Sequence, residues 1–137
     1  MNLTIKGLKT WATSDGGGYQ CNLYKDGKKI AFVHNEGNGS EIQIDWISCE
    51  SEINAYVESL PKVKCGEVEV DSTVGILIDD LVTEYEWQKK LAKHRKNGIL
   101  FRFVTDSVDS FRTLKTLDVA KAVEYLDKNY PNKYVLI

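Results

Sequence analysis

The chain has 137 residues, 42% of them hydrophobic and 28% charged, and 18 basic against 20 acidic side chains give it a net charge of -2. This is the composition of one ordinary globular domain that needs no metal or disulfide to fold, and its near-neutral balance argues against strong nonspecific binding to nucleic acid. No apolar run reaches the length of a membrane span and the N-terminus has no secretory signal, so we expect a cytoplasmic protein without membrane contact.

The clearest local signal is a β-hairpin about Asp26-Gly27. Alternating runs over residues 18–25 and 28–34 flank this dipeptide, which favours a two-residue turn with positive φ at both positions. A regular register would pair four sets of residues across the hairpin: Lys25 with Lys28, Leu23 with Ile30, Cys21 with Phe32, and Tyr19 with His34. The apolar members of these pairs would then share one face.

Periodicity and capping signals predict the other elements. In chain order we expect a strand near Leu3 and Ile5, a strand over 42–46, a helix over 53–60 ended by Pro61, an extended stretch over 67–70, a helix from Ser72 or Thr73 to just before Gly98, a strand over 99–104, a returning strand over 111–115, a helix over 118–129 and a closing strand over 134–137. Ser72 can cap the long helix, and Gly98 suits a left-handed position after it.

Strands and helices therefore come in blocks, which is typical of an α+β fold. We predict an N-terminal antiparallel sheet, two central helices, and a C-terminal β-hairpin and helix. The last helix should turn Val119, Ala122, Val123 and Leu126 inward. We expect a single domain over residues 1–137, because neither half alone would bury much, with 62–71 as the segment where a subdomain junction would fall.

The cysteine count is odd and contains no Cys-x-x-Cys motif. Cys21, Cys49 and Cys65 therefore suggest a reducing compartment, with three small apolar side chains rather than a disulfide framework.

Two glycine-rich loops flank the hairpin, over residues 15–18 and 35–40. The predicted register brings both to the end opposite the turn, where glycine lets a backbone turn sharply and lets a ligand approach closely. We name this candidate ligand- or partner-binding region the glycine-rich rim. Its residues are Asp15, Gly16, Gly17, Gly18, Tyr19, His34, Glu36, Asn38 and Gly39. The plain structural alternative is that both connections are tight and need glycine.

No catalytic motif accompanies the rim. His34 with Asp15 or Glu36 can supply a base and its orienting acid, but no nucleophile is identifiable. The other histidine, His94, belongs to a distant helix, no metal-ligand spacing is present, and phosphate-loop and dinucleotide fingerprints are absent. We therefore favour a non-enzyme without cofactor or metal and leave enzymatic activity open.

A basic run follows the acidic first half of the long predicted helix. Its cationic members are Lys89, Lys90, Lys93, Arg95 and Lys96. Acidic side chains in the first half of a helix and basic side chains in its last turns interact favourably with the helix dipole, so a solvent-exposed helix is the simpler interpretation. The alternative is a phosphate- or acid-facing patch, extended by Arg102 and Arg112. Trp11, Trp46 and Trp87 are expected to pack in the core or at its edge.

Several segments together resemble small, uncharacterised accessory proteins of bacteriophages and prophages. They are Asp15-Gly16-Gly17-Gly18-Tyr19, the run Leu23 to Ala31, Glu36-Gly37-Asn38-Gly39, Leu100-Phe101-Arg102-Phe103 and Thr113-Leu114-Lys115. The resemblance covers about half of the chain and carries no catalytic motif. It implies a viral protein in the bacterial host cytoplasm, where many such proteins bind and inhibit host defence components, including CRISPR effectors.

Four hypotheses follow. The leading one is a non-enzymatic binding protein that inhibits a host defence protein or complex, of the anti-CRISPR or anti-defence type. The second is a binder of a small anionic ligand, such as a sponge for a signalling nucleotide, held at the glycine-rich rim. A small hydrolase using His34 and a nucleic-acid binder using residues 89–96 are weaker alternatives. Homo-oligomerisation stays open.

Overall fold

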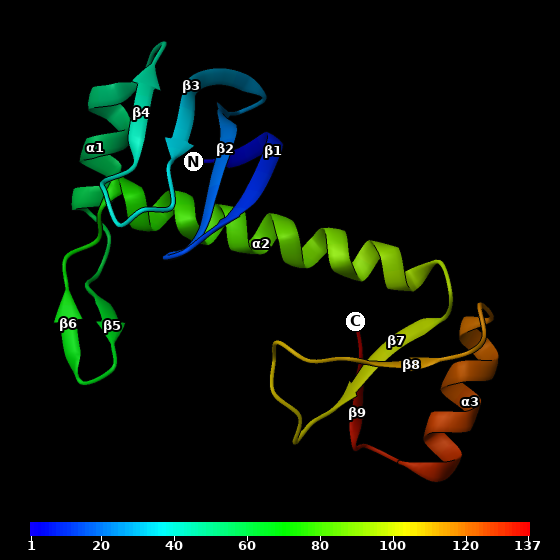
Figure 1. Ribbon diagram of the computed structural model, residues 1–137. Helices are drawn as coiled ribbons and strands as arrows, with labels where there is room; N and C mark the ends of the chain where they lie inside the picture. The colour runs from blue at the N-terminus through cyan, green and yellow to red at the C-terminus, as the bar shows by residue number, and fades with distance from the viewer. The chain divides into compact units, whose positions relative to one another are not determined.

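The structure, a computed structural model, describes residues 1–137 and contains nine strands and three helices (Figure 1). This confirms the predicted α+β class. The contacts divide the chain into two compact units, unit 1 over Met1–Tyr85 and unit 2 over Glu86–Ile137. The boundary lies inside the long helix α2, Val74–Arg95. None of the helices combines the length and apolar composition needed to cross a bilayer.

Unit 1 is built on a four-stranded antiparallel sheet in the order β1-β2-β3-β4. The strands are β1 (Leu3–Thr13), β2 (Gly16–Lys25), β3 (Lys28–Asn35) and β4 (Gln43–Trp46). Helix α1 (Glu50–Glu58) and the first half of α2 pack on one face of this sheet. Leu23, Val33, Ile53 and Ile78 are fully buried in the shared core, where burying each such side chain contributes about 1.5–3 kcal/mol.

The Asp26-Gly27 turn forms as predicted, but the predicted register holds only for the two pairs next to the turn. Asp26 and Gly27 have φ of 51° and 83°, and Lys25 pairs with Lys28. A bulge then leaves Ile30 as an extra residue, and its carbonyl accepts the backbone N–H groups of Ile47 and Ser48.

The bulge shifts every later pair by one residue. Leu23 pairs with Ala31, Cys21 with Val33 and Tyr19 with Asn35, so the three predicted pairs beyond the turn are wrong. Phe32 is turned away from the core, whereas Ile30, Ala31 and Val33 are buried.

A second hairpin lies in unit 1 where only an extended stretch was predicted. Strands β5 (Val63–Cys65) and β6 (Val68–Val70) pair across a turn in which Gly66 has a φ of 67°. The segment considered as a subdomain junction is therefore part of unit 1. The prediction of a single domain over residues 1–137 stays a prediction.

The ends of α2 differ from the capping prediction. Thr73 Oγ1 accepts the backbone N–H of Ile76 and so caps the helix, whereas the Ser72 hydroxyl donates to the carbonyl of Pro61. Gly98 is not left-handed. A Cβ there would lie 2.1 Å from the carbonyl oxygen of Leu114, so glycine is needed because β8 passes close by.

Unit 2 contains a three-stranded antiparallel sheet in the order β8-β7-β9. Its strands are β7 (Ile99–Phe103), β8 (Arg112–Leu114) and β9 (Tyr134–Leu136). Helix α3 (Val119–Asn129) begins at Asp118, whose side chain accepts the backbone N–H of Lys121. The core consists of Leu91, Leu100, Phe101, Ala122 and Leu126. Val119, predicted to point inward, is 54% exposed.

The three cysteines are free thiols in three different environments. Cys21 is buried, Cys49 is half-buried, and Cys65 is exposed. The expectation of a small apolar side chain packed inside therefore fits Cys21 and is wrong for Cys65.

Candidate functional site

The two glycine-rich loops meet, as predicted, at the end of the sheet opposite the Asp26-Gly27 turn. A Cβ on Gly37 would lie 2.6 Å from the backbone of both Gly17 and Gly18, and one on Gly18 would lie 2.7 Å from the carbonyl oxygen of Asn35. The Thr13 hydroxyl donates to the Gly37 carbonyl over 2.5 Å. Glycine is therefore required here because the two backbones touch.

A cluster of three side chains lies on the sheet face opposite the core, at the end of the sheet where the two loops meet. Val33 is buried in the core, so its neighbour His34 points to the other face. There the rings of His34 and Trp11 lie 5.5 Å apart, and His34 Nε2 is 2.8 Å from Glu36 Oε1. The Trp11 indole N–H donates to the Glu36 carbonyl over 3.3 Å. We name Trp11, His34 and Glu36 the outer cluster.

Tyr19 does not belong to this surface. Its side chain faces the core, is 8% exposed, and donates its hydroxyl to Asp79 Oδ1 over 2.5 Å. Burial, and then the hydrogen bond to the Asp79 carboxylate, raise the pKa of Tyr19 well above its ordinary value. The prediction that Tyr19 lies against His34 is wrong, because the bulge at Ile30 places the two residues on opposite faces.

The other rim residues form the exposed connections themselves. Asp15 lies in the turn between β1 and β2, followed by Gly16 with a φ of 127°. In the second loop, the Asn35 side-chain oxygen accepts the N–H of Gly37 over 2.9 Å, and that of Asn38 accepts the N–H of Ser40 over 3.1 Å. These side-chain turns hold the loop in one conformation.

A hollow of about 440 Å³ lies beside the second loop, between β4 and the start of α2. Asn35 and Ser40 are its only members from that loop, and its lining includes the carboxylates of Glu41 and Asp79. Two carboxylates repel an anion, so this hollow does not suit the nucleotide-like ligand considered for the rim.

The outer cluster contains a base and an acid but no group to be activated as a nucleophile. Cys21 is 1% exposed among the core side chains, and burial raises the pKa of its thiol to about 11. Such a thiol is protonated and inert at neutral pH. No group of three or more His, Cys, Asp or Glu side chains is arranged to hold a metal ion. The outer cluster therefore provides hydrogen-bonding groups and an aromatic ring for binding, but no nucleophile.

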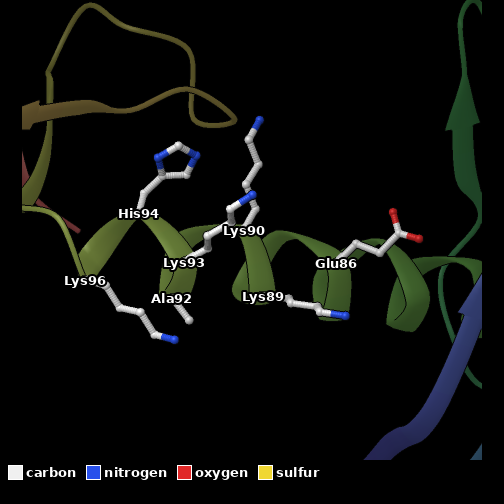
Figure 2. Close-up of a pocket in the computed structure, with 7 residues that line it drawn as sticks. All are labelled: Glu86, Lys89, Lys90, Ala92, Lys93, His94 and Lys96. Carbon is white, nitrogen blue, oxygen red and sulfur yellow. The ribbon is translucent and has the colours of Figure 1, made fainter.

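The basic run lies on the part of α2 that belongs to unit 2, beside a hollow of about 670 Å³ (Figure 2). Lys90 Nζ lies 5.8 Å from the Trp87 ring centre and 5.6 Å from that of Phe111. The His94 ring is 4.9 Å from the Phe111 ring. Sequence reasoning found the cations but missed Phe111, whose place beside the helix no local pattern indicates.

Comparisons of the chain with protein-family models, curated proteins and solved structures give no match.

Proposed function

We propose that this chain is a non-enzymatic binding protein that inhibits a host defence protein or complex through its glycine-rich rim. The observation that carries the proposal is the outer cluster, a tryptophan, a histidine and a glutamate held together on the sheet face opposite the helices. Partly exposed tryptophan is a frequent anchor of protein interfaces, and acid and imidazole groups beside it add directional hydrogen bonds.

The two loops beside the outer cluster are held in one conformation, which favours binding to a partner of complementary shape. The glycine backbones of the two loops are in contact, and side-chain turns at Asn35 and Asn38 hold the second loop. A surface already in its bound conformation loses little conformational entropy on binding, which favours affinity.

The proposed context comes from the resemblance to phage accessory proteins. On that basis we propose the cytoplasm of a bacterial host as its location and CRISPR effectors as the first partners to test. The small-ligand alternative has less support. Gly18 faces the Trp11 ring and the Asn35 carbonyl, Gly37 faces the backbone of Gly17 and Gly18, and Tyr19 points into the core. The glycines therefore do not frame a site in which Tyr19 stacks on a base.

The test pairs two charge reversals in unit 1. Glu36→Lys changes a side chain that is 52% exposed in the outer cluster. Glu67→Lys makes the same change at an exposed position in the β5–β6 turn. Purified protein and both variants are mixed with purified host defence complexes, and co-elution and inhibition of target cleavage are measured.

We expect the unmodified chain and Glu67→Lys to inhibit one complex, and Glu36→Lys to weaken binding about 10-fold or more, as loss of a central contact does. Trp11→Ala should weaken it at least as much. Equal inhibition by Glu36→Lys and Glu67→Lys would exclude the rim as the binding surface. No inhibition of any complex would reject the function.

A further inference from the structure

A hollow of about 490 Å³ lies at the end of the unit 2 sheet where β7 ends and β9 begins. Figure 1 shows the chain turning from α3 into β9 beside it. The hollow is lined by Phe103, Val104, Thr105, Tyr130 and Lys133. Val104 and Tyr130 are among the exposed large hydrophobic side chains of the chain. A hollow of this size, lined by aromatic and apolar groups with few polar ones, is typical of small-molecule sites.

The aromatic wall of this hollow is held in place by its neighbours. The rings of Phe103 and Tyr130 lie 4.8 Å apart, and the Phe101 ring meets that of Phe103 edge-on at 5.6 Å. The Arg112 guanidinium lies 4.4 Å from the Phe103 ring centre. The Tyr130 N–H donates to the Leu126 carbonyl over 2.7 Å, which fixes Tyr130 at the end of α3. The wall is therefore preformed, and binding a flat ring against it costs little ordering of the protein.

Lys133 is the one charged side chain that lines the hollow. It is exposed and takes part in no ion pair, whereas Arg112, beyond the Phe103 ring, is paired with Asp106. No carboxylate lines the hollow. A free ammonium group without a competing carboxylate attracts an anionic group to the edge of an apolar site.

The charge of unit 2 as a whole acts in the same direction. Residues 86–137 contain eleven Lys and Arg against six Asp and Glu, a net charge of +5. Residues 1–85 contain seven against fourteen, a net charge of -7. An anion is therefore attracted to unit 2 and repelled by unit 1.

The backbone around the hollow offers a ligand few hydrogen bonds, because its groups are paired with one another. The Val104 N–H donates to the Lys133 carbonyl over 2.9 Å, and the Lys133 N–H donates to the Tyr130 carbonyl over 3.2 Å. The Phe103 carbonyl accepts the Asp106 N–H over 2.9 Å. A peptide in the hollow would leave its own main-chain groups without such partners, which is costly. The chemistry therefore favours an apolar ligand with one anionic end.

We propose that this hollow binds a small aromatic carboxylate. The ring of the ligand packs against Phe103, Val104 and Tyr130, and its carboxylate accepts a hydrogen bond from the Lys133 ammonium group. The Thr105 hydroxyl, on the same hollow, donates to the second carboxylate oxygen. This site lies in unit 2, so it goes beyond the glycine-rich rim and does not depend on the proposed inhibitory function.

The first test is an NMR titration of the isotope-labelled full chain with cinnamate, a planar aromatic carboxylate. We expect saturable shifts of the Val104, Thr105 and Lys133 amide signals with a Kd of about 1 mM or lower, as the efficiency of small ligands allows. Cinnamamide, which has nearly the same shape without the charge, should bind about 3- to 10-fold more weakly. No saturation by about 20 mM cinnamate, or saturable shifts centred elsewhere in the chain, would overturn the proposal.

A matched pair of lysine variants tests the anionic end. Lys133→Gln removes the ammonium group of the hollow, and Lys128→Gln removes an exposed lysine of α3 that does not line it. We expect Lys133→Gln to weaken cinnamate about 3- to 10-fold and to leave cinnamamide within about twofold, and Lys128→Gln to change neither by more than about twofold. Equal affinities of the two variants for cinnamate would overturn the assignment of an anion to Lys133.

A matched pair of tyrosine variants tests the aromatic wall. Tyr130→Ala removes part of the wall and should weaken cinnamate and cinnamamide alike, about 5-fold or more. Tyr125→Ala, at an exposed α3 position outside the hollow, should leave both affinities within about twofold. Unchanged binding in Tyr130→Ala would overturn the proposed wall.

A peptide ligand distinguishes a free acid from a chain terminus. N-acetyl-glycyl-phenylalanine carries a ring and a carboxylate on a peptide, and it should bind no more tightly than cinnamate because the backbone groups of the hollow are already paired. Binding about 10-fold tighter than that of cinnamate would show that the hollow recognises a peptide terminus, and would overturn the assignment to a free aromatic acid.

Discussion

The two units of this chain differ in charge and in how completely they bury their apolar side chains. Unit 1 is acidic and has eleven buried core residues, whereas unit 2 is basic and has five. Eight of the eleven exposed large hydrophobic side chains, including Val104, Val108 and Leu117, belong to unit 2. A shallow core with exposed apolar side chains gives low local stability. Unit 2 should therefore open more readily than unit 1.

The largest expected effect tests whether the two cores are separate. Leu23 is fully buried in unit 1, and Leu23→Ala should destabilise that unit by about 2–5 kcal/mol, through lost burial and the cavity left behind. Hydrogen exchange of the β2 and β3 amides should accelerate strongly, and that of the β7 amides much less.

Leu126→Ala, which removes a fully buried side chain from unit 2, is the matched variant and should show the opposite pattern. Equal acceleration in both units for either variant would mean that they unfold as one cooperative body. The two units would then not have independently stable cores.

An intermediate effect concerns alkaline pH and unit 1. Tyr19→Phe removes the hydrogen bond to Asp79 and should cost about 1.5–3 kcal/mol, the range for bonds to charged groups. The pKa of Tyr19 is raised in the folded chain above its ordinary value of 10.0. Its stabilising effect is therefore complete below pH 10.0 and is lost as the pH rises beyond it.

The measurement is the free energy of unfolding between neutral and strongly alkaline pH, with Tyr19→Phe compared with the unmodified chain. Burial raises the pKa of the Cys21 thiol from 9.0 to about 11, so ionisation of this thiol also lowers the free energy of unfolding as the pH rises. The thiol is present in both proteins, so its effect cancels in the comparison. The variant should therefore show a shallower decline above pH 10.0. Parallel declines would show that Tyr19 is not held in its neutral form.

The smallest effect concerns acid and unit 2. Arg112 donates to both oxygens of Asp106, over 3.0 and 3.2 Å, and the Phe103 N–H donates over 2.9 Å, so the pKa of Asp106 is lowered. This stabilisation is present above the ordinary aspartate pKa and is lost as the pH falls through the lowered value.

Asp106→Asn should remove this acid dependence and lower the stability of unit 2 at neutral pH by a similar amount, which is small because the pair is exposed at Arg112. β7 amide exchange between neutral and acidic pH measures it. If the variant retained the full acid dependence, another carboxylate of unit 2 would be responsible.

Much of the local structure was predictable because short-range chemistry determines it. Asp-Gly between alternating runs predicted the turn, and apolar spacing predicted α1, α2 and α3. The meeting of the two glycine-rich loops followed from the hairpin alone. It survived a one-residue register shift, because a shift of one residue does not move a loop to the other end of a sheet.

The face on which His34 lies was decided by tertiary structure. The Ile30 carbonyl accepts two backbone N–H groups from the chain just after β4, and these long-range bonds accompany the bulge in β3 that leaves His34 on the outer face, whereas Tyr19 faces inward with Cys21 and Leu23 by the alternation of β2. No local pattern near residue 30 contains that partner. The role of Gly98 likewise depends on β8, which follows later in the chain.

The order of elements and the total charge were therefore determined by the sequence itself, since each depends on neighbouring residues or on simple counting. The place where α2 passes from one unit to the other emerged only from contacts distant in sequence. That boundary separates a net charge of -7 from one of +5, so the fold determines that the two opposite charges belong to different units.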